Sequence, residues 1–202
     1  MLDVLWLGLV LGTGAALSVG PIFVTILHES ATRGFTAGMR VILGSATADL
    51  VLLLPALLLS QVIAAVAGAA LWVAVAGAVF MTGLAAFALR DAIKLWRGHV
   101  PEMAGGWAFW KGLLSNLLNP LSWTFWLATG TPTMLAAQHS GGWPGLLLFT
   151  VVWFVTASGL EGVLAFVVSR SGRRIGHRGQ AGLSAASAAL FLGLAGFLLV
   201  RI

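Results

Sequence analysis

Six long apolar stretches, each nearly free of charged residues, dominate this sequence. Short polar or Gly/Pro-rich connectors separate them, and they run over Val4–Leu27, Ala37–Ser60, Val62–Leu89, Gly112–Ala136, Pro144–Val168 and Gly182–Val200. An α-helix needs about 20 apolar residues to cross about 30 Å of hydrocarbon. The stretches are continuous, without the alternation of a membrane β-barrel strand. We therefore predict an all-α integral membrane protein with six transmembrane helices in a single transmembrane domain, residues 1–202.

The low charge content excludes most other classes of protein. Only 8% of the 202 residues are charged, against about 25% in an ordinary soluble domain. Because so few polar groups cannot cover a globule, a soluble enzyme is excluded, and no nucleic-acid partner is expected despite the net charge of +5. Cysteine is absent, and no Walker loop, Ser-His-Asp arrangement or HExxH motif occurs. We therefore expect no catalytic residues, no metal site and no cofactor.

The positions of the basic residues predict the orientation of the chain. All of them except Arg201 lie in or beside the first, third and fifth connectors. Basic residues are in excess in the cytoplasmic loops of membrane proteins. We therefore expect these three connectors in the cytoplasm and both termini on the outer side of the membrane.

This orientation gives the two halves of the chain, roughly residues 1–98 and 106–202, opposite senses across the membrane. Each half has a proline within its first helix, at Pro21 and at Pro120. Transporters built as inverted repeats share both features. The sequence therefore suggests a 3+3 inverted repeat in which helices 1 and 4 are broken by proline.

The two helix breaks are candidate substrate sites. A proline inside a spanning helix removes a backbone donor, and such breaks are tolerated in membranes where they line a cavity. The half-helices after the breaks would present free N–H groups and a positive dipole end, which suit a substrate carboxylate. A kinked packing helix is the alternative. The predicted substrate-binding residues here are Gly20 and Pro21 at the first break, and Asn116, Asn119 and Pro120 on one face at the second.

Two acidic residues lie within the predicted spans, where an ionised carboxylate costs about 2.5–3.5 kcal/mol. Asp49 is near the middle of the second stretch, beside Gly44 and Ala48, whose small side chains permit close helix approach. We predict that Asp49 binds a substrate amine or carries a coupling proton; a packed, hydrogen-bonded carboxylic acid is the alternative. Glu161, toward the cytoplasmic end of the fifth stretch, is a second candidate for proton coupling, or else it lies in a cytoplasmic vestibule.

Other residues carry weaker predictions. Trp126 is a candidate wall of the substrate pocket, and a lipid-facing position or core packing is the alternative. Most members of another set suit an interfacial belt: Trp6, Trp107, Trp110, Trp143 and Trp153. Gly8 and Gly12 form a small-xxx-small pair that suits helix packing or a homodimer. The histidines fall in connectors or at helix ends. The remaining acids do so as well and are expected to be solvated: Asp3, Glu29, Asp91, which is spaced to pair with Lys94, and Glu102.

Two segments resemble signatures of the LysE/RhtB amino-acid exporter family. The first runs from Gly20-Pro21 through Arg33-Gly34 to Asp49, and the second, Phe109–Pro120, is similar to a basic-Gly-Leu-Leu-x-Asn-x-x-Asn-Pro motif. Length and helix number agree over nearly the whole chain. The resemblance implies a secondary transporter of a bacterial inner membrane that exports an amino acid or related small metabolite, driven by proton entry.

The departures from the family pattern lie where a ligand would be recognised. Val19 and Ile22 stand where the family often has Pro and Asn, and Leu121 stands where many members have Lys. These differences leave the substrate open. A cation or heavy-metal exporter of the same superfamily is the alternative function. In either case the expected partners are a small-molecule substrate and the lipid bilayer.

Overall fold

The computed structural model describes residues 1–18, 20–57, 59–99, 107–174 and 176–200. Every regular element within these ranges is helical. In chain order the helices are α1 (Leu2–Leu17), α2 (Pro21–Arg33), α3 (Phe35–Leu57), α4 (Leu59–Trp96), α5 (Trp107–Leu117), α6 (Pro120–Phe125), the π-helix η1 (Trp126–Gly130), α7 (Thr131–Arg174) and α8 (Gly176–Val200). The described chain is therefore all-α, as the apolar stretches predict.

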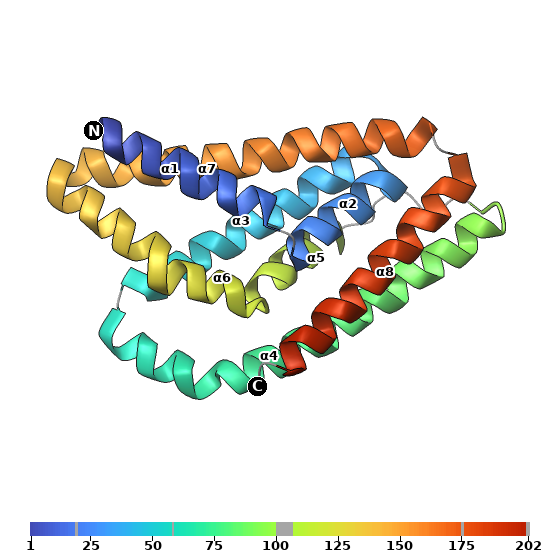
Figure 1. Ribbon diagram of the computed structural model, residues 1–202, viewed down its shortest axis with the longest axis horizontal. Coiled ribbons are helices and arrows are strands. Elements are labelled where there is room, and N and C mark those ends of the chain that lie inside the picture. Colours follow the sequence, from blue (N-terminus) through green and yellow to red (C-terminus); the bar gives the residue numbers. More distant parts are fainter. Residues whose placement is uncertain (19, 58, 100–106, 175, 201–202) are drawn as a thin grey trace.

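The helices pack largely as neighbouring pairs. α1 lies along α7 and α8 lies along α4, as Figure 1 shows, and α3 packs against α5. The short helix α2 contacts α3, α5, α7 and α8. Most of its residues are buried, so α2 is a central element of the bundle.

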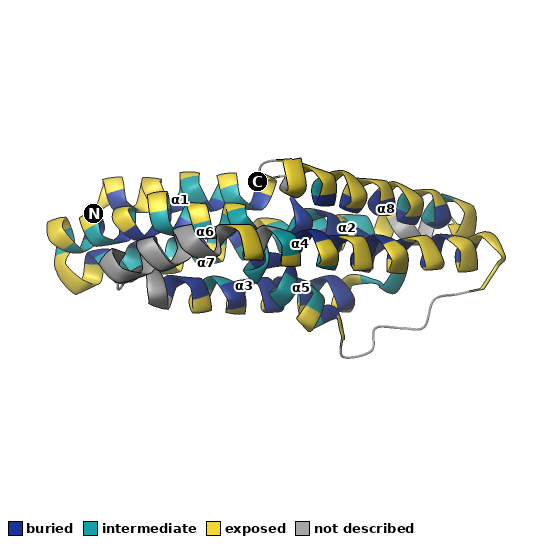
Figure 2. Ribbon diagram, turned by 90° about the horizontal axis from the view of Figure 1, so that it is seen from below, coloured by how far each residue is buried: buried dark blue, intermediate teal, exposed yellow. Residues whose placement is uncertain are grey.

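Within the described residues, four helical segments are long and apolar enough to cross a membrane. They are Phe35–Leu53, Val75–Trp96, Pro120–Ser171 and Gly176–Phe197, and α1 with α2 forms a fifth if the bent pair is one span. Large apolar side chains are exposed on the outer faces of these helices (yellow in Figure 2), among them Trp6, Val10, Val79, Phe87, Val151, Val155, Leu190 and Leu192. Such a surface suits contact with lipid rather than water.

The chain leaves the helical conformation immediately before Pro21 and Pro120, where the helix breaks are predicted. α1 ends at Leu17 and α2 starts at Pro21, and the two helices are bent by 65°. α5 ends at Leu117 and α6 starts at Pro120. Proline suits the first position of a helix, because its missing N–H would have no partner there.

A glycine turns the long helix α7. Gly142 has φ 61° and ψ −156°, a backbone conformation that residues other than glycine rarely adopt. The predicted fourth connector therefore contains a sharp turn rather than a loop. Beyond the turn, Gly8 and Gly12 of α1 pack directly on Val152 and Trp153 of α7, so this small-residue pair is used within the chain.

The helices α3 and α5 approach so closely that their backbones touch at two glycines. A Cβ added to Gly44 would meet the backbone oxygen of Phe109, and one added to Gly112 would meet that of Val41. The close approach expected around Gly44 is thus confirmed. It brings the end of α5 against the face of α3 that carries Asp49.

Gly112→Ala should destabilise the protein, because the new methyl group would overlap the backbone of α3. Overpacking of this kind typically costs about 1–3 kcal/mol. The measurement is the Tm of the purified protein in detergent. Gly83→Ala in α4 is the matched control, because a Cβ there meets no atom within 4 Å. Equal Tm values for the two variants would contradict the close approach of α3 and α5.

Candidate functional site

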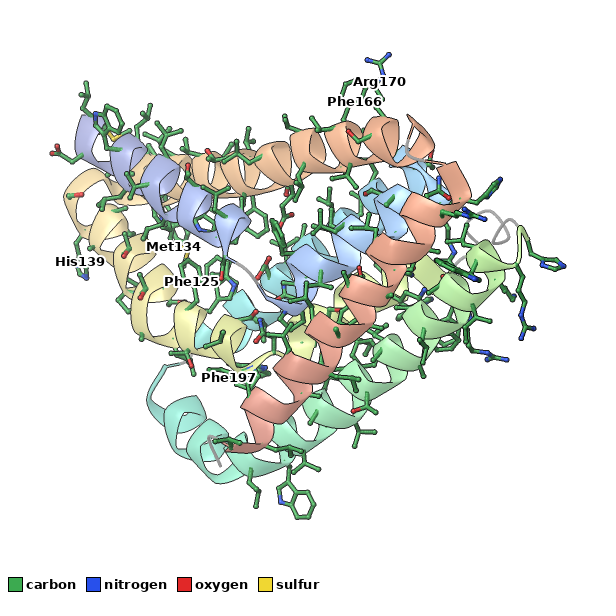
Figure 3. The ribbon with its side chains drawn as sticks, turned by 45° about the vertical axis from the view of Figure 1, so that its right-hand side comes forward. Phe125, Met134, His139, Phe166, Arg170 and Phe197 are labelled. Carbon is green, nitrogen blue, oxygen red and sulfur yellow. The ribbon has the colours of Figure 1, made fainter. Side chains whose placement is uncertain are left out.

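A cavity of about 510 Å³ lies where the two helix breaks meet. Its walls come from the end of α1, the first turn of α2, the middle of α3, the end of α5, the α6–η1 segment and α7. Phe125, a wall residue at the end of α6, lies on the side of α6 toward α1 in Figure 3. Two breaks that are far apart in the sequence therefore border one space.

Most of the predicted site residues are brought together at this cavity. Its lining includes Gly20, Asp49, Asn116, Asn119 and Glu161. Pro21 and Pro120 start the helices that adjoin it. Trp126 is not among the lining residues, but it contacts one of them, as described below.

Asp49 and Glu161 face the cavity from opposite helices, α3 and α7. Both side chains are half-buried, and they are close enough to interact electrostatically. Trp126 donates a hydrogen bond from Nε1 to Asp49 Oδ1 over 2.8 Å. Glu161, which the sequence places toward the cytoplasmic end of its helix, therefore belongs to the same site as Asp49.

The two amides of the second break have different surroundings. Asn116 Nδ2 donates to the backbone oxygen of Ser45 at 2.9 Å and to its Oγ at 3.1 Å. The buried Oδ1 of Asn116 has no hydrogen-bond partner within the described chain. Asn119 instead caps α6: its Oδ1 accepts from Leu121 N at 3.2 Å, and its Nδ2 donates to Ser122 Oγ at 3.1 Å. The expected single helix face is interrupted, because α5 ends between the two residues.

The two helix N-termini are not equivalent. The start of α6 is capped by Asn119, and this helix has only six residues. The start of α2 has Gly20 as its N-cap and no side-chain capping bond. Since Ile22 and Phe23 of this first turn also line the cavity, the N-terminus of α2 is the end that remains available to an anion.

Aromatic side chains form one wall of the cavity. Phe125, Trp153 and Phe154 line it, and the rings of Phe125 and Trp153 stack with centroids 5.5 Å apart. Trp153 is only 3% exposed, so it is an exception to the interfacial belt that is expected for most tryptophans of its set. A tryptophan near a span end is amphipathic in either position, and sequence alone does not separate the two.

Sequence reasoning also missed small polar residues in the lining. Ser45 precedes Asp49 by four residues, and Ser158 precedes Glu161 by three, so each shares a helix face with its acid. Small polar residues at helical spacing from a buried acid are a signal that would have found them. Thr129 and Ser122 also line the cavity, but lie beyond the second break and carry no such signal.

A second polar cluster lies at the other end of α2, and it corrects the expectation that Glu29 and Asp91 are solvated. Glu29 is 1% exposed and pairs with Lys111 at 2.6 Å and with Arg33 at 3.2 Å. Asp91 pairs with Arg33 at 2.6 Å and with His28 Nε2 at 3.1 Å. These five residues form the basic-end ion cluster, which joins α2, α4 and α5.

The cluster changes one further expectation. The partners of Asp91 are Arg33 and His28 rather than the Lys94 that its spacing suggested. His28 is buried in the cluster, at 4% exposure. Asp3 is exposed as expected, and Glu102 lies outside the described residues. Buried carboxylates in an apolar protein need partners of this kind.

A cavity at broken helices that holds two carboxylates, enclosed by an apolar helical bundle, is an arrangement typical of membrane transporters. The family model of the LysE type translocator matches residues 14–201 of the chain. The chain therefore belongs to the LysE type translocator family, as its two motifs indicated. Members of this family are transporters rather than enzymes, and they export amino acids or related compounds across a membrane.

No significant match is found among curated proteins or among solved structures. In the part of the chain that the structure describes, no three His, Cys, Asp or Glu side chains gather in a way that could hold a metal ion.

Glu29→Gln should lower the stability of the protein, because it removes the negative charge between Lys111 and Arg33. Breaking one partner of a buried ion pair typically costs about 3–5 kcal/mol. The measurement is Tm in detergent, with Asp3→Asn as a control that removes an equal charge from an exposed position. If both variants melt together, the cluster does not hold α2, α4 and α5 in place.

Proposed function

We propose that this protein is a proton-coupled secondary transporter that exports an amino acid or a related small metabolite across a bacterial inner membrane. The observation that carries the proposal is the cavity at the two helix breaks, which holds both Asp49 and Glu161. A broken helix next to buried acids is an arrangement that binds polar substrates at mid-membrane.

The cavity offers complementary groups for the two ends of an amino acid. The uncapped N-terminus of α2, after Gly20, supplies a positive dipole end for the carboxylate. Asp49 supplies a negative charge for the ammonium group, and the unpaired Oδ1 of Asn116 is an additional acceptor beside it. Asn119 and Pro120 act less directly in this scheme, by shaping the second break.

The two carboxylates also provide a reason for coupling. An ionised carboxylate at this depth is costly unless a positive charge accompanies it. A proton on Asp49 or Glu161 and a substrate ammonium beside it are alternative ways to balance the same charge. Exchange of one for the other would link proton entry to substrate exit.

Six membrane crossings fit the described helices. Pro120–Ser171 is 52 residues long, so it would span roughly 78 Å if straight. That length is more than twice the hydrocarbon thickness of about 30 Å, and the segment turns at Gly142. We propose that it crosses twice, that α1 with α2 crosses once, and that the halves 1–98 and 106–202 form an inverted repeat within one domain.

The ends of the helices support the proposed orientation. The C-terminal ends of α4 and α7 and the start of α8 lie together at one end of the molecule in Figure 1. These ends carry Arg97, Arg170 and Arg178, and Figure 3 shows Arg170 projecting outward beside Phe166. The positive-inside rule would place this end in the cytoplasm and both termini outside.

Labelling of single introduced cysteines tests this orientation. The natural chain has no cysteine, so it gives no background labelling. Ser140→Cys and Arg170→Cys introduce single thiols at exposed positions of α7. A membrane-impermeant maleimide should label Ser140→Cys in intact cells, whereas Arg170→Cys should react only after the inner membrane is permeabilised. The opposite pattern would reverse the orientation.

Transport in proteoliposomes tests the function itself. Each of the twenty protein amino acids, radiolabelled, is offered under an imposed pH gradient, with divalent cations as a separate arm for the alternative function. Asp49→Asn and Glu161→Gln should each reduce gradient-driven uptake at least tenfold, because neither amide can exchange a proton. Asp3→Asn is the control that should leave uptake unchanged. Full coupled transport by Asp49→Asn would remove Asp49 from the mechanism.

A further inference from the structure

Trp126 lies behind the residues that line the cavity, and a hydrogen bond connects it to one of them, Asp49. Its side chain is almost fully buried, at 2% exposure, and it is not among the residues that line the cavity. Its Nε1–H donates to Asp49 Oδ1 over 2.8 Å. The residue is therefore one contact removed from the cavity and acts on a carboxylate that lines it.

The indole ring of Trp126 is held by the aromatic wall of the cavity. Its centroid lies 4.9 Å from that of Trp153, 5.3 Å from that of Phe125 and 6.2 Å from that of Phe154. All three of these rings line the cavity. A displacement of the wall is therefore transmitted to the indole through direct ring contacts.

The backbone around Trp126 is specialised as well. The π-helix η1 starts at this residue and ends at Gly130, and such turns are rare in proteins. A Cβ on Gly130 would lie 2.7 Å from Trp126 Cε3. The glycine thus leaves the space in which the indole points its N–H at Asp49.

We propose that Trp126 is a positioning residue that fixes the Asp49 carboxylate for the substrate and relays contact of the substrate side chain with the aromatic wall to that carboxylate. This inference rests on the proposed function, in which Asp49 exchanges a proton for a substrate ammonium. A neutral donor aimed at Oδ1 favours the ionised carboxylate. It keeps Asp49 ready for the ammonium without competing for the cavity.

The charged surroundings of Asp49 are simple. Glu161, on α7, is the other ionisable side chain among the lining residues, and those from α1, α2, α5, α6 and η1 are apolar or neutral. A change in the pH dependence of transport in a Trp126 variant therefore reports on Asp49 and Glu161 together. Separate variants of the two acids tell them apart.

Trp126→Phe removes the N–H donor and keeps an aromatic ring. With the amino acid that wild type transports best in the twenty-member screen, KM should rise about tenfold, as expected for a lost hydrogen bond to a charged group. We expect kcat to change less than twofold. The pH at which uptake is half-maximal should move upward by about one unit, because the carboxylate has lost a donor that favours its charged form.

Trp123→Phe is the matched control. Trp123 also donates through Nε1 over 2.8 Å, but to the backbone oxygen of Leu117, and it does not line the cavity. The same substitution there should leave KM and the pH profile unchanged. A Trp126→Phe protein that behaves like Trp123→Phe overturns the proposal.

Gly130→Ala keeps the indole and pushes it off its position, so it should change KM and the pH profile in the same direction. If Trp126→Phe does not yield a monodisperse protein, Gly130→Ala is the variant that tests the proposal. A wild-type KM and pH profile in Gly130→Ala would then overturn it. If wild type shows no gradient-driven uptake of any amino acid, the proposed function itself fails. If Asp49→Asn retains full coupled uptake, Asp49 is not part of the mechanism and this inference fails with it. Loss of uptake in Asp49→Asn with unchanged Trp126→Phe refutes the inference alone.

Discussion

The need to satisfy every backbone hydrogen bond away from water governs this structure. In hydrocarbon an unpaired N–H or C=O group costs several kcal/mol, so the chain crosses the membrane as helices. Interruptions are then exceptional and need partners of their own. The breaks before Pro21 and Pro120 face the same cavity. Asn119 caps the helix after the second break, whereas the start of α2 has no side-chain cap. The candidate site therefore lies where the helices are interrupted.

Features that depend on local sequence could be predicted. The apolar spans and the breaks at Pro21 and Pro120 follow from runs of residues and from the chemistry of proline. Asp49 stands out because an ionised acid in an apolar run is costly in a bilayer. Its location in the cavity agrees with that reasoning, whereas its role in transport is still a proposal.

Features that depend on packing could not be predicted. Glu29 and Lys111 are 82 residues apart, and their position beside helix ends is equally typical of solvated charges. Tryptophan is typical of the membrane interface, but the side chain of Trp153 lines the cavity. Trp126, which donates a hydrogen bond to Asp49, begins a π-helix, and periodicity gives no sign of such a turn. Each of these contacts arises from the relative rotation of helices, which a single sequence does not specify.

The position of α2 has a mechanical consequence. Its 13 residues form a rod about 20 Å long, with the cavity at Gly20 and the ion pairs of Glu29 and Arg33 near the far end. A hydrogen-bonded helix this short does not bend easily, so a tilt at one end is a displacement at the other. A movement that reshapes the cavity by tilting α2 therefore also displaces Glu29 and Arg33 and strains their salt bridges at the opposite end.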